Sequence, residues 1–400
     1  MTAQADSARG WLVVAAAFAA MFTTVGVAFS YGALIGPLSS DLGVGQGAAA
    51  GVFSLTSACF FGLGAISGHV VDRVGPRPVL LAGAASFGLG LAATAAAPRL
   101  WVVYLGHGLG GGLAAACAFV PLVSVVSAWF NVRRTLAVGI AVSGIGVGTL
   151  VVAPAAAAAI EAYGWRSTYA WIAGLGSLVL LLCALVVARP PVAPSAGVVP
   201  LRDSLDTADY RRLYLGQLLL AAAMFVPFVY LPSSAQELGV HPVAAAGLVG
   251  VIGAVSLVGR LALAPVADKV GIVPAYRACF LAMGASFLLW GLASGYAVLV
   301  AFAVIFGLGY GGFVALGPGV LAQRFGTARL GGLLGLLYTS SALGSSVGPF
   351  AAGVLIHHGG YRAGIVMALL LGLAATVVVA GVSDRRHAAA PLSPGGSLEA

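Results

Sequence analysis

The chain has 400 residues, of which 60% are hydrophobic and only 8% are charged, and its formal net charge is +8. A soluble domain carries about 25% charged residues because water must wet its surface, so this composition excludes a water-soluble globular protein. With a mean hydropathy of +1.06, the chain is expected to have lipid as its main solvent and to fold as an all-α membrane protein.

Twelve apolar segments recur along the chain, each close to the roughly 20 residues that a membrane-spanning helix needs. The first of these apolar segments is too long for a cleaved signal peptide, and it lacks a small-residue cleavage site. In chain order the predicted spans are Trp11–Gly36, Gly47–His69, Pro78–Ala97, Leu100–Ser127, Leu136–Ile160, Tyr169–Ala188, Leu213–Ser233, Val243–Pro265, Tyr276–Ala293, Tyr296–Leu321, Gly332–His357 and Gly364–Val382.

The basic residues are distributed unevenly between the two ends of these spans. Fifteen of the 19 Lys and Arg fall on the side that holds both termini, and three (Arg99, Arg166 and Arg362) fall on the other side. The positive-inside rule then predicts cytoplasmic termini for a multi-pass protein of the cell inner membrane. The basic excess therefore orients the chain, and no nucleic-acid partner is expected.

A polar segment, Arg189–Arg212, divides the spans six and six and is interpreted as a cytoplasmic linker. The predicted division is an N-terminal bundle over 1–188, the linker over 189–212, and a C-terminal bundle with a short tail over 213–400. The two halves resemble copies, because several residues repeat at a constant offset of 196 positions: Gly75 and Gly271, Asp72 and Asp268, Pro78 and Pro274, Arg133 and Arg329, Gly139 and Gly335, Gly148 and Gly344, Arg166 and Arg362. Parallel repeats of this kind place a binding site at their interface, near the bilayer midplane.

The loop after the second span, Gly68–Arg77, has the sequence GHVVDRVGPR, and a weaker copy, APVADKVG, follows the eighth span. It resembles the cytoplasmic loop signature of the major facilitator superfamily, which implies twelve helices in two pseudo-symmetric bundles. An Asp at a helix end followed by cations can pair with neighbouring loops in one state only, so a gate is predicted. A solvated turn that only enforces topology is the alternative. The predicted gate residues are Asp72, Arg73, Arg133, Arg134, Asp268 and Lys269.

Two further stretches are similar to the monocarboxylate transporter family. Trp129–Gly144 (WFNVRRTLAVGIAVSG) resembles that family's fifth-helix signature, and Gly10-Trp11 with Gly26–Ala33 resembles its opening helix. Two departures indicate a bacterial branch: Arg9 stands where an acidic residue precedes the Gly-Trp, and the first-helix lysine of animal members has no counterpart. Coupling mechanisms assigned to that lysine therefore do not transfer to this chain.

Arg260 stands inside the otherwise uncharged eighth span. A charge at membrane depth is costly and faces a protein interior or a water-filled cavity. All eleven Asp and Glu are expected in loops, helix ends or tails, so a substrate anion is the predicted counter-ion, held by the planar guanidinium. Snorkelling is the alternative, because Arg260 lies about seven residues, or about 10 Å, from the cytoplasmic helix end. One intramembrane cation suits a monoanion.

The other predicted site residues lie in the middle of their spans. Tyr310 and Ser341 can donate hydrogen bonds to the same carboxylate, Tyr31 and Phe119 are candidate aromatic walls, and His107 is a candidate proton relay. For each of them, packing against a neighbouring helix is the alternative.

These features predict a secondary active transporter, a proton-coupled symporter of small monocarboxylates such as lactate or pyruvate. The alternatives are an organic-anion exchanger of the oxalate or formate type, an exporter of another small acid and, from another class, a membrane enzyme or non-transporting sensor. An enzyme, a cofactor and a partner protein are not expected. A metal site is not expected either, because Cys59, Cys117, Cys183 and Cys279 lie singly in apolar spans.

Overall fold

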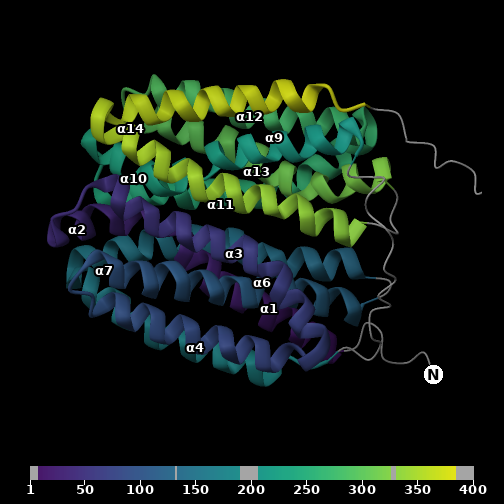
Figure 1. The fold of residues 1–400 in the computed structure, drawn as a ribbon, viewed down its shortest axis with the longest axis horizontal. Helices are drawn as coiled ribbons and strands as arrows, with labels where there is room; N and C mark the ends of the chain where they lie inside the picture. Colours follow the sequence, from purple (N-terminus) through teal and green to yellow (C-terminus); the bar gives the residue numbers. More distant parts are fainter. Residues whose placement is uncertain (1–7, 131–132, 190–205, 326–329, 384–400) are drawn as a thin grey trace, which may run out of the picture.

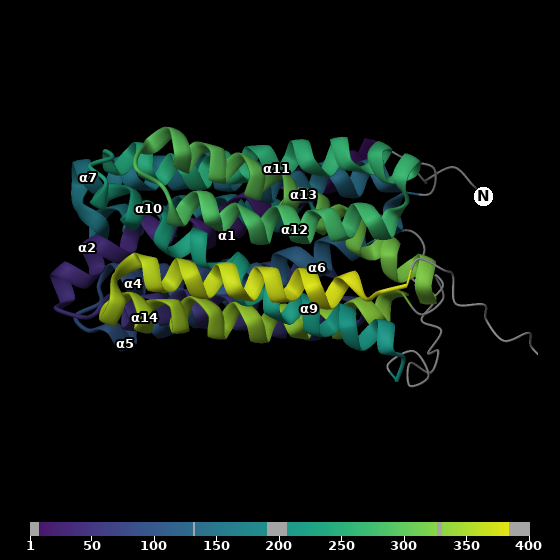
Figure 2. The same ribbon diagram turned by 90° about the horizontal axis from the view of Figure 1, so that it is seen from above.

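The computed structural model describes residues 8–130, 133–189, 206–325 and 330–383. Every element of these ranges is a helix, and the helices run along the long axis in two groups, α1 to α7 and α9 to α14 (Figures 1 and 2). Both ends of the described chain lie at the right-hand end of Figure 1, which is called the terminal end below; the opposite end is the far end.

The N-terminal half begins with α1 (Ala8–Phe29) and α2 (Gly32–Leu42). The remaining elements are α3 (Gln46–Val74), α4 (Pro76–Ala95), α5 (Leu100–Val103), the π-helix η1 (Tyr104–Gly111), α6 (Gly112–Trp129) and α7 (Arg134–Val186).

The C-terminal half repeats this arrangement of helices. Its elements are α9 (Ala208–Met224), α10 (Val226–Glu237), α11 (Pro242–Val270), α12 (Ile272–Gly291), α13 (Tyr296–Phe325) and α14 (Leu330–Ala380). Residues 190–205 lie outside the described ranges, so the division of the chain at the linker stays a prediction.

Ten helices of the described chain are long and apolar enough to cross a membrane. Two of them, Leu136–Val186 and Leu333–Ala380, have 51 and 48 residues, about twice the length of one crossing. Each is interrupted by a glycine outside the helical region, Gly164 with φ 77° and Gly360 with φ 69°. Each therefore folds back at its glycine, which accounts for the twelve predicted spans.

The turns confirm the internal repeat. Positive φ occurs at Gly43 and Gly239, at Gly75 and Gly271, and at Gly164 and Gly360, and the members of each pair are 196 positions apart. Only glycine adopts this backbone region without a steric penalty, so the same turn in each copy needs glycine at the same register.

Two predicted spans are broken rather than continuous. The first, Trp11–Gly36, is divided between α1 and α2, where the Ser30 hydroxyl bonds to the Val27 carbonyl and competes with the backbone ladder. The seventh, Leu213–Ser233, is divided between α9 and α10, where Pro227 cannot donate a backbone hydrogen bond.

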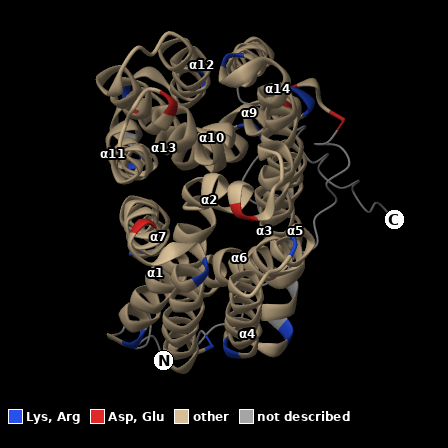
Figure 3. Cartoon of the chain, turned by 90° about the vertical axis from the view of Figure 1, so that its left-hand side faces the viewer, with Lys and Arg blue, Asp and Glu red and all other residues tan. Residues whose placement is uncertain are grey.

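The outward face of the bundle is apolar, as lipid contact requires. Leu89, Leu261 and Val377 are 75%, 72% and 74% exposed. Viewed from the far end, the two helix groups lie one above the other with α2 between them, and the described charged residues are few (Figure 3).

Within each half, glycines allow two helices to pack closely. A Cβ on Gly148 would lie 2.5 Å from the Phe22 carbonyl oxygen, and one on Gly344 would lie 2.4 Å from that of Leu218. Both members of each contact are 196 positions apart, so α7 packs on α1 as α14 packs on α9.

Candidate functional site

A cavity lies between the two halves and extends from the middle of the molecule toward the terminal end. Its lining reaches Pro318 near the end of α13 and Leu334 near the start of α14, and it includes Phe29 at the end of α1. Both halves contribute to it, which is the position expected for a site between parallel repeats.

Arg260 enters this cavity from α11. Its neighbour Leu261 is largely exposed on the outer face, whereas Arg260 is half-buried on the inner one. One guanidinium nitrogen, Nη1, donates to the carbonyl of Val142 in α7 of the other half, at 3.2 Å. The side chain therefore points across the interface rather than along α11 toward the helix end.

Arg260 has no carboxylate partner within the described part of the chain. The ion pairs found there are Arg166–Asp41, Arg211–Asp206, Arg212–Asp209, His241–Glu161 and Arg324–Asp209, and Arg260 Nε is buried without a hydrogen-bond partner. A guanidinium supplies five N–H donors, so most of its donors remain available to an anion in the cavity.

Three tyrosines, Tyr276, Tyr310 and Tyr338, line the cavity beside Arg260. Tyr310 is close enough to interact electrostatically with both Arg260 and Tyr338, and Tyr338 in turn with Tyr276. Among the described residues, none of the three hydroxyls makes a hydrogen bond to protein. Of the three, the sequence predicted only Tyr310.

Ser341 lines the same cavity, and a residue that the sequence did not single out positions it. The Gln217 side chain donates to the Ser341 hydroxyl oxygen at 2.8 Å and to the Leu337 carbonyl at 3.3 Å. Because Ser341 accepts from Gln217, its own proton is free to point into the cavity. Gln217 was detectable in the sequence as a polar amide inside an apolar span.

Phe119 also lines the cavity, within a group of phenylalanines from the N-terminal half. Its ring packs edge-on against that of Phe60, with the ring centroids 5.6 Å apart, and the centroids of Phe60 and Phe61 are 4.5 Å apart. Phe61 in turn lies 5.7 Å from Phe225 of the other half. These rings form a continuous aromatic wall across the interface.

Two predicted residues do not reach the cavity, which corrects their placement. Tyr31 is fully buried in the N-terminal half, where its hydroxyl donates to the Ala49 carbonyl at 2.7 Å. His107, in η1, is enclosed between the rings of Tyr31 and Tyr169 at 4.8 and 5.7 Å. Both imidazole nitrogens lack a hydrogen-bond partner among the described residues, so no described polar group links His107 to the cavity.

The predicted gate residues lie at the terminal end. Arg73, Arg133, Asp268 and Lys269 are exposed there, and none of them forms an ion pair with another described residue. The side chains of Asp72 and Arg134 lie outside the described residues. The gate role stays a prediction for all six.

At the far end the two halves are in close contact. A Cβ on Gly47 would lie 3.0 Å from the backbone of Gly353, and the Tyr361 hydroxyl bonds to Gln46 at 3.0 Å. His241 and Glu161 also form an ion pair between the halves at 3.3 Å. The cavity thus opens toward the end of the molecule opposite these contacts.

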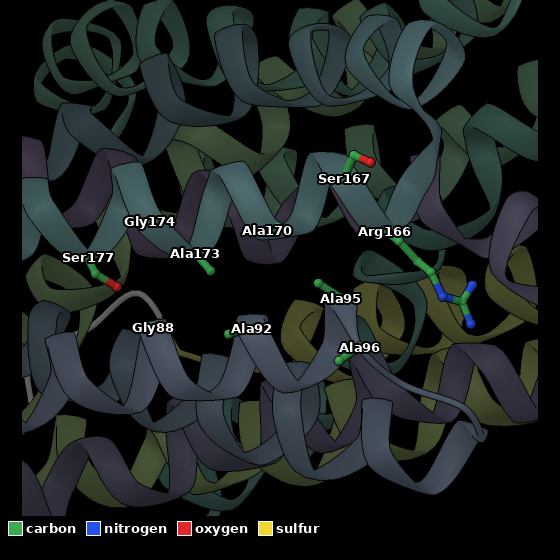
Figure 4. Close-up of a pocket in the computed structure, with 10 residues that line it drawn as sticks. All are labelled: Gly88, Ala92, Ala95, Ala96, Arg166, Ser167, Ala170, Ala173, Gly174 and Ser177. Atoms are coloured by element: carbon green, nitrogen blue, oxygen red, sulfur yellow. The ribbon is translucent and has the colours of Figure 1, made fainter.

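A second, shallow groove lies between α4 and α7 on the outside of the N-terminal half (Figure 4). Small side chains line it, with Arg166 at one end and Ser177 at the other. Arg166 is engaged by Asp41 and by the Ala97 carbonyl, so this groove offers no free cation. In the described residues no cluster of His, Cys, Asp and Glu fits a metal ion.

The comparisons with known proteins agree with this architecture. The profile of the Major Facilitator Superfamily matches residues 14–287 and 213–398. The chain is 32% identical over 369 residues to monocarboxylate transporter 3 of Rattus norvegicus, covering 88% of this chain and 75% of that protein. It is 31% identical to monocarboxylate transporter 11 of Homo sapiens, covering 88% and 78%.

Among solved structures, the fold is similar to an inward-facing, unoccupied bacterial homologue of the human lysosomal transporter Spinster. The TM-score is 0.76 at 15% identity, over 94% of this chain and 97% of that one. It is also similar to a peptide transporter in complex with sulfate, with a TM-score of 0.75 at 15% identity over 93% of each chain.

Proposed function

We propose that this chain, which belongs to the monocarboxylate transporter family of the major facilitator superfamily, carries small monocarboxylates across the membrane together with a proton. Family membership makes it a membrane transporter rather than an enzyme. The finer assignment rests on one observation, a guanidinium in the central cavity that has no carboxylate partner among the described residues.

In this proposal Arg260 holds the substrate carboxylate, and the hydroxyls of Tyr310, Tyr338 and Ser341 donate the remaining hydrogen bonds. Charge-assisted bonds to a carboxylate are shorter and about twice as strong as neutral ones, so the anion is fixed at this wall. The far-end contacts between the halves would then break as the terminal end closes, which exposes the site to the opposite side by rocking of one half on the other.

The proton is proposed to travel with the substrate. No Asp or Glu lines the cavity within the described part of the chain, and His107 is enclosed away from it, so the described lining offers no carboxylate or imidazole to carry the charge. Protonation of the acid itself lowers the net charge that must cross in the closed cavity, where an uncompensated ion is costly. An inward proton gradient should therefore drive uptake of labelled pyruvate or lactate into proteoliposomes.

The same observation favours one alternative, exchange of organic anions. A carrier with a lone cation in its cavity returns most easily when a second anion replaces the first. Uptake that requires a counter-substrate inside the proteoliposomes and does not depend on the proton gradient would indicate exchange rather than symport.

The site assignment is tested with Arg260→Gln in proteoliposomes. Removing one partner of a buried charge pair costs about 3–5 kcal/mol, so uptake should fall at least about 100-fold. Arg99→Gln is the matched control, because Arg99 is an exposed arginine at the far end. Normal uptake by a folded Arg260→Gln protein would remove the assignment.

A further inference from the structure

The polar side chains of the cavity are distributed unevenly between the two halves. Among the described residues, the polar side chains that line it all come from the C-terminal half: Gln217, Arg260, Tyr276, Tyr310, Tyr338 and Ser341. The described lining of the N-terminal half is apolar and includes four phenylalanines, Phe29, Phe60, Phe61 and Phe119. A ligand that satisfies both walls must itself be amphipathic, with its anionic group toward one half and its apolar part toward the other.

The rings of the apolar wall are arranged as aromatic side chains arrange themselves around one another. Phe60 and Phe119 are edge-to-face at an interplanar angle of 69°, and Phe61 and Phe225 at 62°. Aromatic rings gain from such offset or edge contacts in addition to the area that they bury. A further ring placed against Phe60, Phe61 and Phe119 could make the same type of contact.

The charges of the lining narrow the ligand further. Among the described residues of the lining Arg260 is the one charged side chain, so a ligand ammonium group would find no carboxylate there and a second carboxylate would find no second cation. Burying either group without a partner is costly. This argues against aromatic amino acids and against dicarboxylates.

We infer that the preferred substrate is an aryl-substituted monocarboxylate without an amino group, bound with its carboxylate on Arg260 of the C-terminal half and its ring against the phenylalanines of the N-terminal half. The inference rests on the proposed function and sharpens its substrate class. A short acid such as lactate or pyruvate has no ring to place against these phenylalanines.

Competition for transport tests this with matched acids. Phenylpyruvate differs from pyruvate by one phenyl group and should inhibit uptake of the labelled acid at a concentration at least about tenfold lower. Phenylacetate should compete better than cyclohexylacetate, which has a similar size but no π-system, and L-phenylalanine should not compete. Equal potency of phenylpyruvate and pyruvate would overturn the inference.

A variant of the apolar wall separates ring recognition from general damage. Phe119→Leu should weaken competition by phenylpyruvate several-fold more than it weakens competition by pyruvate. Phe87→Leu is the matched control, because Phe87 is buried in the same half and does not line the cavity. An equal loss for both acids in Phe119→Leu would count against the inference. If no monocarboxylate competes and Arg260→Gln is silent, the proposed function itself fails; if pyruvate is carried through Arg260 without a gain from the phenyl group, only the aryl preference fails.

Discussion

The two halves of this molecule share their packing but not their chemistry. Gly148 and Gly344 make the same backbone contact in each copy, and three pairs of turn glycines keep the offset of 196. The polar cavity residues have no polar counterpart at this offset: the residues at the positions of Gln217, Arg260, Tyr276, Tyr310, Tyr338 and Ser341 are Met21, Gly64, Leu80, Ala114, Val142 and Ile145. A duplicated scaffold therefore carries a one-sided site.

The two copies therefore keep the same residues where helices contact each other, whereas the residues that line the cavity differ between them. A glycine in a backbone contact has no substitute because any Cβ would overlap a carbonyl oxygen. A cavity-facing side chain meets open space, so a change there leaves the packing unaltered. The first variants therefore remove polar groups from the C-terminal side of the cavity only.

The largest effect is expected from the double variant Tyr310→Phe/Tyr338→Phe. Hydrogen bonds to a charged group contribute about 1.5–3 kcal/mol each, so the loss of two should weaken substrate binding by about 100-fold or more. Ligand-dependent thermal stabilisation of the purified protein measures it. Tyr163→Phe, at a largely exposed tyrosine, is the control and should behave like the wild type.

Paired glycine substitutions test the shared packing. Gly148→Ala and Gly344→Ala should each lower the stability by about 1–3 kcal/mol, because overpacking a tight contact costs this much. Gly139→Ala and Gly335→Ala are matched controls in the same helices, where a Cβ would meet nothing within 4 Å. Thermal unfolding in detergent measures the stability of all four variants. If Gly148→Ala lowered the stability and Gly344→Ala did not, the packing would not be equivalent in the two halves.

A smaller effect is expected from Gln217→Leu on the polar wall. Without the donor on its oxygen, Ser341 can turn its proton away from the cavity, which should cost about 1 kcal/mol, or about fivefold, in substrate affinity. Met21→Leu, at the corresponding position of the other half, is buried and outside the cavity lining and should leave the affinity unchanged. An unaltered affinity in Gln217→Leu would mean that Ser341 does not contact the substrate.

The smallest effect is expected at the far end. Glu161→Gln removes the ion pair with His241, which joins the halves with side chains 50% and 63% exposed. Exposed pairs contribute about 0–1 kcal/mol, so the transport rate should change less than about fivefold. Asp206→Asn, which removes a more exposed pair, with Arg211, that does not join the halves, is the control. A much larger change would assign the pair a dominant role in closing this end.

Much of the fold could be predicted from the sequence because a membrane demands long, uninterrupted apolar segments. The repeat was also visible in the sequence, because it consists of residue types at a constant spacing, and Gly75 and Gly271 were the turn glycines identified from it. Interruptions were missed where they depend on a local competitor for backbone hydrogen bonds, as at Ser30, or on Pro227.

The site was predicted only in part. Arg260, Tyr310, Ser341 and Phe119 line one cavity, and a charge, two hydroxyls and a ring in mid-span were the signals for them. Other cavity residues, such as Tyr276, Tyr338, Gln217, Phe60 and Phe61, were missed because many aromatic residues occur in these spans and sequence position does not tell which face of a helix they occupy. Tyr31 and His107 were misplaced for the same reason.

Composition and spacing were sufficient to predict that lipid is the main solvent, that the apolar spans are duplicated and that one costly cation lies within them. Only the tertiary structure decided where that cation points and which groups surround it. The reason is physical: apolarity and turn chemistry are properties of a segment, whereas a cavity wall is assembled from single side chains of nine helices, α1, α3, α6, α7, α9, α11, α12, α13 and α14, within the described chain.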